Sequence, residues 1–368
     1  MTELRRPERP RTALERTAGV KLASASLPRA LGVAVLLLIV AAAVGVSVGP
    51  TSLSLATVWN GIAEHVPLMP HGHVNSVDAA IMWQIRAPRV VLAAIVGAML
   101  AGGGATYQGV FRNPLADPYL LGVAAGGGLG ATVVIVSGGS SELLPISAFV
   151  GATAAVALTY ALGNTARWDT GPGAAGVGNT SIILAGVAVA ALFTAVQTYL
   201  MQQHLTTIQT VYGWILGQLT LASWTDVGTV APYAAVAATL LVVLASRIDV
   251  LRVGEEEAST LGVDPNRLRL MLVATATLGT AAAVAVSGLI GFVGIIVPHA
   301  VRLTTSSSYR ILLPVSMVAG AAFLILADAA ARTVQAPSEI PLGVVTAIVG
   351  APFFLFVLRS KRARTALS

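Results

Sequence analysis

Long uncharged apolar runs separated by short polar connections dominate the chain. There are ten such runs, and each predicts a membrane helix, because about 20 apolar residues cross a hydrocarbon core of about 30 Å. They cover residues 30–48, 90–110, 119–137, 143–163, 181–201, 229–246, 270–287, 288–301, 311–331 and 342–358. The eighth run is short and contains Gly291, Gly294 and Pro298, which predicts a tilted or broken helix, or one buried by its neighbours.

The run at 90–110 contains residues that a purely lipid-facing helix does not need. It carries Gln108 and several glycines within an uncharged stretch. Gly97, Ala101 and Ala105 recur every four residues, a spacing that lets two helices approach closely. We therefore expect this helix to lie inside a bundle, with Gln108 lining a pathway.

Composition supports a multi-pass membrane protein. Of the 368 residues, 55% are hydrophobic and 10% charged, and the mean hydropathy is +0.81, whereas soluble proteins carry about 25% charged residues. No stretch outside the apolar runs is long enough for a separate soluble domain. The absence of cysteine excludes disulfides, thiolate catalysis and cysteine-ligated zinc.

The basic residues predict the topology. The net charge is +6, but these residues sit at the ends of apolar runs, where they set orientation, so nucleic-acid binding is not expected. With ten spans, all basic residues except Arg86, Arg89 and Arg332 fall on one side, which predicts cytoplasmic termini.

The expected divisions are a tail at 1–29, a transmembrane domain at 30–359 and a tail at 360–368. The run at 30–48 is too long for a typical signal peptide, so an uncleaved first helix is favoured.

The connection at 247–269 predicts a docking surface. Three acidic residues follow Gly254, and acids favour a helix N-terminus. Gly262 stops that helix, and Asp264 and Pro265 begin the next. We expect two short helices at about 250–266 on the cytoplasmic face. Residues 202–224 predict a further short surface or re-entrant helix that ends at Trp214–Gly217.

Candidate chemistry is sparse. Asp328 is the only carboxylate well inside a run, and such groups are functional suspects. Arg332 follows one helical turn later, so an ion pair is favoured over a proton or cation site. The loop before the second run contains His65, His71 and His73, but no carboxylate organises them, and no metal site is predicted. Neither lysine lies in a phosphate-binding loop, so we expect no enzyme activity and no ATP hydrolysis by this chain.

The chain from about 30 to 359 resembles the FecCD/BtuC-type permeases, the membrane subunits of type II ABC importers. Nine motifs in order carry the resemblance: Arg86–Arg89 (RAPR); Gln108 with Arg112–Pro118 (RNPLADP); Leu184–Val187 (LAGV); Trp214–Gly217 (WILG); Gly254–Glu256 with Leu261 and Gly262; Gly291–Gly294 with Pro298, His299 and Arg302; Leu326–Asp328 with Arg332; Glu339–Pro341 (EIP); and Gly350–Phe353 (GAPF). The eighth run departs from the family, since Ser287 and Gly288 stand where a Gly-Pro step is usual.

The resemblance implies an all-α permease fold of ten transmembrane helices and roles for some of the motifs. Binding-protein docking falls to Arg86, Arg89 and Arg332, the three residues that charge counting places outside. The cytoplasmic gate maps onto Asn113, Pro114 and Leu115. Coupling to the ATPase maps onto Gly254, Glu255, Glu256, Ala258, Leu261 and Gly262. Expected partners are a second permease (identical or paralogous), two ABC ATPase subunits that bind ATP-Mg, an external substrate-binding protein and membrane lipid; the chain itself needs no cofactor.

The implied function is import across a bacterial plasma (inner) membrane. A ferric siderophore is the first choice of substrate, followed by haem and cobalamin. Two other classes stay open: an ion-coupled secondary transporter that uses Asp328, and a membrane scaffold or receptor without transport.

Overall fold

The computed structural model describes residues 13–65, 72–168 and 177–359, and every regular element in these ranges is helical. The elements are α1 (Ala13–Ser47), α2 (Leu55–Ala63), α3 (Ser76–Ala80), the π-helical turn η1 (Ile81–Arg86), α4 (Ala87–Val110), η2 (Pro118–Leu121), α5 (Val123–Val136), α6 (Leu143–Trp168), α7 (Val177–Gln203), η3 (Leu205–Thr207), α8 (Ile208–Ile215), α9 (Trp224–Val253), α10 (Glu255–Thr260), α11 (Pro265–Ser287), α12 (Val293–Thr304), α13 (Tyr309–Ala331) and α14 (Leu342–Arg359).

Each of the ten predicted runs overlaps one α-helix. Within the described residues, seven helices are long and apolar enough to cross a membrane: those containing Leu27–Ser47, Ser76–Val110, Leu143–Asn164, Thr180–Gln203, Trp224–Val253, Pro265–Ser287 and Tyr309–Ala331. The remaining three runs form the shorter apolar helices α5, α12 and α14. The chain is therefore a multi-pass membrane protein, and ten complete crossings with cytoplasmic termini stay a prediction.

The second span is longer than the sequence predicted. The run at 90–110 places Arg86 and Arg89 before the helix, but the helical span begins at Ser76 and continues through η1 into α4. The π-helical turn ends at Arg86, two residues before Pro88, which has no N–H group for a regular helical hydrogen bond. The two arginines therefore lie within the span, which the absence of charge in 90–110 could not indicate.

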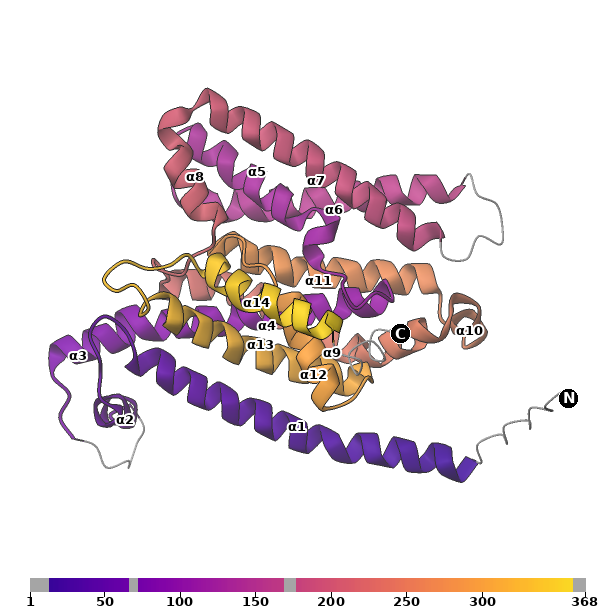
Figure 1. Ribbon diagram of the computed structural model, residues 1–368, viewed down its shortest axis with the longest axis horizontal. Coiled ribbons are helices and arrows are strands. Elements are labelled where there is room, and N and C mark those ends of the chain that lie inside the picture. Colours follow the sequence, from indigo (N-terminus) through magenta and orange to yellow (C-terminus); the bar gives the residue numbers. More distant parts are fainter. Residues whose placement is uncertain (1–12, 66–71, 169–176, 360–368) are drawn as a thin grey trace, which may run out of the picture.

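The core of the bundle is formed by α4, α11 and α13. In their most apolar stretches 78%, 72% and 72% of residues are buried, against 22–28% in the other four long spans. In Figure 1, α5 to α8 form a group on one side of α11, and α1 runs along the opposite side against α13. The helices α2 and α3 lie at one end of the bundle and α10 at the other. We call these the α3 end and the α10 end.

Small residues let α4 meet its neighbours, as the spacing of Gly97, Ala101 and Ala105 predicted. A Cβ atom on Gly97 would overlap the carbonyl oxygen of Gly320 in α13, and one on Gly104 would overlap Gly294 in α12. Backbone therefore packs directly on backbone, where no side chain fits.

We expect Gly97→Val to separate α4 from α13. Overpacking of a dense core costs about 1–3 kcal/mol, and here the obstacle is backbone that cannot rotate away. Thermal unfolding in detergent measures the effect. Gly32→Val is the matched control, because a Cβ atom on Gly32 meets nothing within 4 Å. Equal unfolding midpoints for the two variants would contradict this packing.

The predicted boundaries near the short helices agree with the structure. The helix α11 ends at Ser287, Gly288 has φ +69°, and α12 begins at Val293. The expected helix between 202 and 224 is α8, which stops just before Gly217 with φ +71°. Backbone N–H groups at the start of α14 donate to the last carbonyls of this segment, Leu342 to Gly217 at 2.9 Å and Gly343 to Leu216 at 3.0 Å.

Candidate functional site

Five charged residues gather at the α3 end, and we call them the arginine cluster: Arg86, Arg89, Asp328, Arg332 and Glu339. Arg86 is the last residue of η1 and Arg89 lies in the first turn of α4. Asp328 and Arg332 come from the end of α13, and Glu339 from the connection to α14. The fold thus brings together the three arginines that the sequence predicted for docking.

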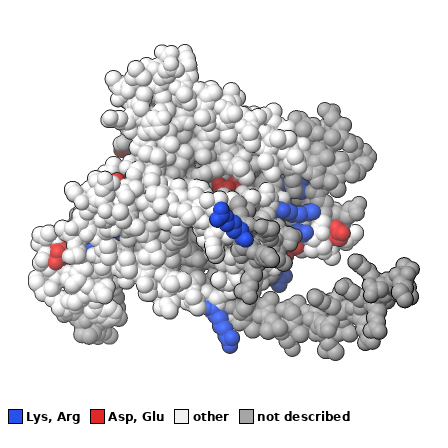
Figure 2. All heavy atoms as spheres, in the orientation of Figure 1, with Lys and Arg blue, Asp and Glu red and all other residues white. Residues whose placement is uncertain are grey.

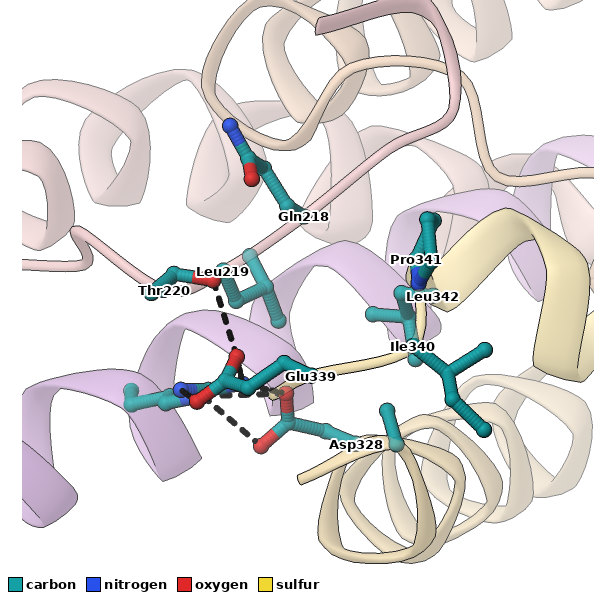
Figure 3. Close-up of a pocket in the computed structure, with 10 residues that line it drawn as sticks. Gln218, Leu219, Thr220, Asp328, Glu339, Ile340, Pro341 and Leu342 are labelled. Atoms are coloured by element: carbon teal, nitrogen blue, oxygen red, sulfur yellow. Dashed lines mark hydrogen bonds and ion pairs between the residues drawn. The ribbon is translucent and has the colours of Figure 1, made fainter. Parts of the chain in front are cut away.

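Arg89 is the centre of the cluster. Its Nε and Nη2 atoms donate to Asp328 at 2.8–3.0 Å, and Nη1 and Nη2 each donate to a different oxygen of Glu339 at 2.9 Å. The hydroxyl of Thr220, from the connection between α8 and α9, also donates to Glu339 at 2.9 Å. Figure 3 shows the carboxylates of Asp328 and Glu339 converging beside Thr220. Arg89 therefore links α13 to the connection that precedes α14.

The other two arginines bind mainly to α1. Arg332 pairs with Asp328 at 3.3 Å, the ion pair that the sequence favoured, and donates to the carbonyl of Gly45 at 2.7 Å. Arg86 donates to the carbonyls of Val46 and Ser47 at 2.7 and 2.8 Å, and also to that of Thr51. The last carbonyls of a helix have no partner within it. The guanidinium groups satisfy them and join α1 to α4 and α13.

All three arginines are buried, with 3%, 6% and 3% of Arg86, Arg89 and Arg332 exposed. In this conformation their guanidinium groups are not available at the surface, so their docking role stays a prediction. The distribution of basic residues along the sequence did identify these three arginines as unusual. It could not identify the carboxylate partners of Arg89, because Arg89 and Glu339 are 250 residues apart.

The cluster lowers the pKa of Glu339. Burial alone would raise its pKa, but hydrogen bonds and attraction from Arg89, with a further bond from Thr220, outweigh burial and lower the pKa below its ordinary value. The adjoining cavity of about 50 Å³ is lined by Arg89, Asp328, Glu339 and residues 218–220, among others. It has room for water and none for a chelate or a corrin.

The predicted gate residues form a tight turn at the α10 end. Asn113 accepts a hydrogen bond from the backbone of Leu115 at 2.9 Å through its side chain, and from Ala116 at 3.0 Å through its carbonyl. This turn holds Pro114 half-buried and leaves Leu115 39% exposed. Burial raises the pKa of the neighbouring Asp117 to about 6. The turn is well defined, and its opening and closing stay a prediction.

Gln108 is 3% exposed and holds α4 to α12 in this conformation. Its amide nitrogen donates to the carbonyl of Gly294 at 3.0 Å, and its amide oxygen accepts from Arg302 at 2.9 Å. Sequence reasoning placed all three residues in motifs without joining them. A pathway-lining role for Gln108 stays a prediction.

The predicted coupling stretch forms one short helix followed by a long one. Gly254 has φ +156° and precedes α10, and Gly262 has φ +75° after it. Ala258 is fully buried, whereas Leu261 is 66% exposed. The side chains of Glu255 and Glu256 lie outside the described residues. The expected second short helix is the first turn of α11, where Asp264 accepts from the backbone of residues 266 and 267.

Charge is unevenly distributed between the two ends. In the view of Figure 2, most visible Lys and Arg atoms lie in the right half, towards α10, and the remaining surface is largely uncharged. This agrees with the basic bias that the sequence predicted. The α3 end instead buries its arginines.

The histidine loop contains no metal cluster among the residues that the structure describes. The Nδ1 atom of His65 lies 3.0 Å from the carbonyl oxygen of Gly61, and its ring packs on Trp83 at a centroid distance of 4.8 Å. His71 lies outside the described residues. That this loop binds no metal stays a prediction.

Known proteins resemble this chain over most of its length. Residues 36–360 match the model of the FecCD transport family. The chain is 42% identical over 292 residues to the cobalamin import system permease protein BtuC of Halobacterium salinarum, covering 79% of this chain and 76% of that protein. It is 35% identical over 346 residues to the hemin transport system permease protein HmuU of Yersinia pestis, covering 91% and 97%.

A solved structure has the same arrangement of helices. It is an inward-facing conformation of a metal-chelate type ABC transporter, matched with a TM-score of 0.78 and 29% identity over 90% of this chain and 100% of that one. The shared fold, the match over residues 36–360 and the identity to permeases establish that this chain belongs to the FecCD transport family of ABC importer permeases.

Proposed function

We propose that this chain is the translocation subunit of an ATP-driven importer for a ferric siderophore in a bacterial plasma (inner) membrane. It pairs with a second permease, identical or paralogous, and with two ATPase subunits that bind ATP-Mg, and it receives substrate from an external binding protein. One observation carries the proposal. At the α10 end, Arg112 directly before the gate turn bonds to Leu251 in the last turn of α9, which leads into the coupling stretch, while the arginine cluster lies at the opposite end.

The mechanism is alternating access driven from the α10 end. ATP binding by the partner subunits displaces α10, the displacement reaches the turn around Asn113, and substrate passes between the two permeases. Docking through Arg86, Arg89 and Arg332 requires the α3 end to open, because their guanidinium groups already bind α1, Asp328 and Glu339. An ion-coupled transporter has less support, since Asp328 is held by two arginines.

Haem and cobalamin are the alternative substrates, supported by the similarity to a hemin permease and a cobalamin permease. Fluorescence titration of the cognate binding protein with ferrichrome, hemin and cyanocobalamin discriminates among them. Tight binding of ferrichrome alone is the expected result. Binding of cyanocobalamin or hemin without ferrichrome would reassign the substrate, and uptake that persists without the ATPase subunits would overturn the importer mechanism.

The absence of cysteine allows docking to be tested without disturbing the arginine cluster. A single cysteine at Val334, 73% exposed at the α3 end, can carry an environment-sensitive fluorophore. We expect the binding protein to change its emission, and to leave unchanged a probe at Leu261 near α10. A change in emission at Leu261 but not at Val334 would instead place docking at the α10 end.

A further inference from the structure

Arg112 has a backbone conformation that arginine rarely adopts. Its φ is +50°, and Phe292 is the only other non-glycine residue with positive φ in the part of the chain that the structure describes. Arg112 lies one position beyond the C-cap of α4, Phe111. Its N–H donates to Gly109 and that of Asn113 to Gln108, at 3.4 and 3.1 Å. Glycine is the usual residue at this position of such a helix end, because a Cβ atom is strained there.

The side chain of Arg112 offers a reason for the strain. Its Nε atom donates to the carbonyl oxygen of Leu251 at 3.1 Å. Leu251 is buried in the last turn of α9, where carbonyl groups lack helical partners and the helix end attracts a positive charge. Glycine would relax the turn but could not make this bond.

The bond joins two elements that the proposed function requires to move together. Only Gly254 separates the end of α9, at Val253, from α10. On the other side, Arg112 is followed directly by Asn113, the first residue of the gate turn. Asp249 and Arg252, also near the end of α9, bind elsewhere, to the segment 307–309 that begins α13. Arg112 therefore links the gate turn directly to the helix that leads into the coupling stretch.

We propose that Arg112 is a positioning residue that transmits displacement of α9 and α10 to the gate turn. The inference rests on the proposed function and adds the residue through which the ATPase acts. The strained backbone places the guanidinium group against the end of α9. A shift of that end therefore moves Arg112 and, through the peptide bond, the adjacent Asn113.

Replacement by glycine separates this role from a structural one. Arg112→Gly removes the bond and relieves the strain, so its thermal unfolding midpoint should equal or exceed that of the wild type. Uptake per ATP hydrolysed should fall about tenfold, a typical size for coupling between two sites. The assay uses proteoliposomes that contain both permeases, the ATPase subunits and the binding protein, with ferrichrome, hemin and cyanocobalamin tested in parallel.

Two further variants complete the test. Arg247→Gln removes an exposed positive charge from α9, one turn before Leu251, and should leave the ratio of uptake to hydrolysis unchanged. Arg112→Lys retains a hydrogen-bond donor, so it should lower the ratio of uptake to hydrolysis less than Arg112→Gly does. A wild-type ratio in Arg112→Gly, or a proportional loss of stability, uptake and hydrolysis, would overturn the inference. Wild-type protein that shows no ATP-dependent uptake would instead refute the proposed function.

Discussion

Replacing Asp328 by asparagine is expected to lower the free energy of unfolding by about 3–5 kcal/mol, the usual cost of breaking a buried ion pair. Asp328 is 1% exposed and accepts hydrogen bonds from Arg89 while pairing with Arg332. Asparagine keeps the shape but removes the charge, so three buried arginines are left with Glu339 as the only carboxylate of the cluster. Titration with sodium dodecyl sulfate in mixed micelles measures the loss.

Asp264→Asn is the matched control for this substitution. Asp264 forms an exposed pair with Arg267 at 3.3 Å and caps α11. Asparagine caps a helix about as well as aspartate, and exposed pairs contribute under about 1 kcal/mol. Adding Arg332→Met to Asp328→Asn should recover part of the loss, because it removes an uncompensated buried charge. Equal losses for Asp328→Asn and Asp264→Asn would show that the arginine cluster does not stabilise the bundle.

Leu261→Asp is expected to prevent assembly with the ATPase subunits while the permease still folds. Leu261 is 66% exposed just after α10, so an aspartate there meets water in the isolated chain. In the proposed complex it would place a charge in an apolar contact, and loss of a central contact commonly costs 2 kcal/mol or more, which weakens binding about thirtyfold. Co-purification and the dissociation constant in nanodiscs measure the effect.

Val334→Asp is the control for assembly. Val334 is similarly exposed, at 73%, but lies after α13 at the α3 end. The same apolar-to-acidic change there should leave ATPase binding unaltered. If both variants bind the ATPase as the wild type does, the coupling role of the stretch from Gly254 to Gly262 is wrong.

The helices and their boundaries were largely predictable because they depend on local chemistry. Uncharged length predicts a membrane-embedded helix, and each of the ten runs overlaps one. Glycine and aspartate at 262 and 264 correctly predicted the end of α10 and the start of α11. The predicted start of the second span was wrong, because Arg86 and Arg89 are charged and the sequence does not reveal the groups that neutralise them.

The sequence alone determined that this is a helical membrane protein with the ordered motifs of one permease family, since apolar length and motif spacing are properties of the chain itself. Only the tertiary structure decided what the polar residues contact. Arg89 meets Asp328 and Glu339, Gln108 meets Arg302, and Arg112 meets Leu251, across separations of 139 to 250 residues. The burial of Arg89 follows from its contacts, because a guanidinium group can leave water only where acceptors receive its hydrogen bonds.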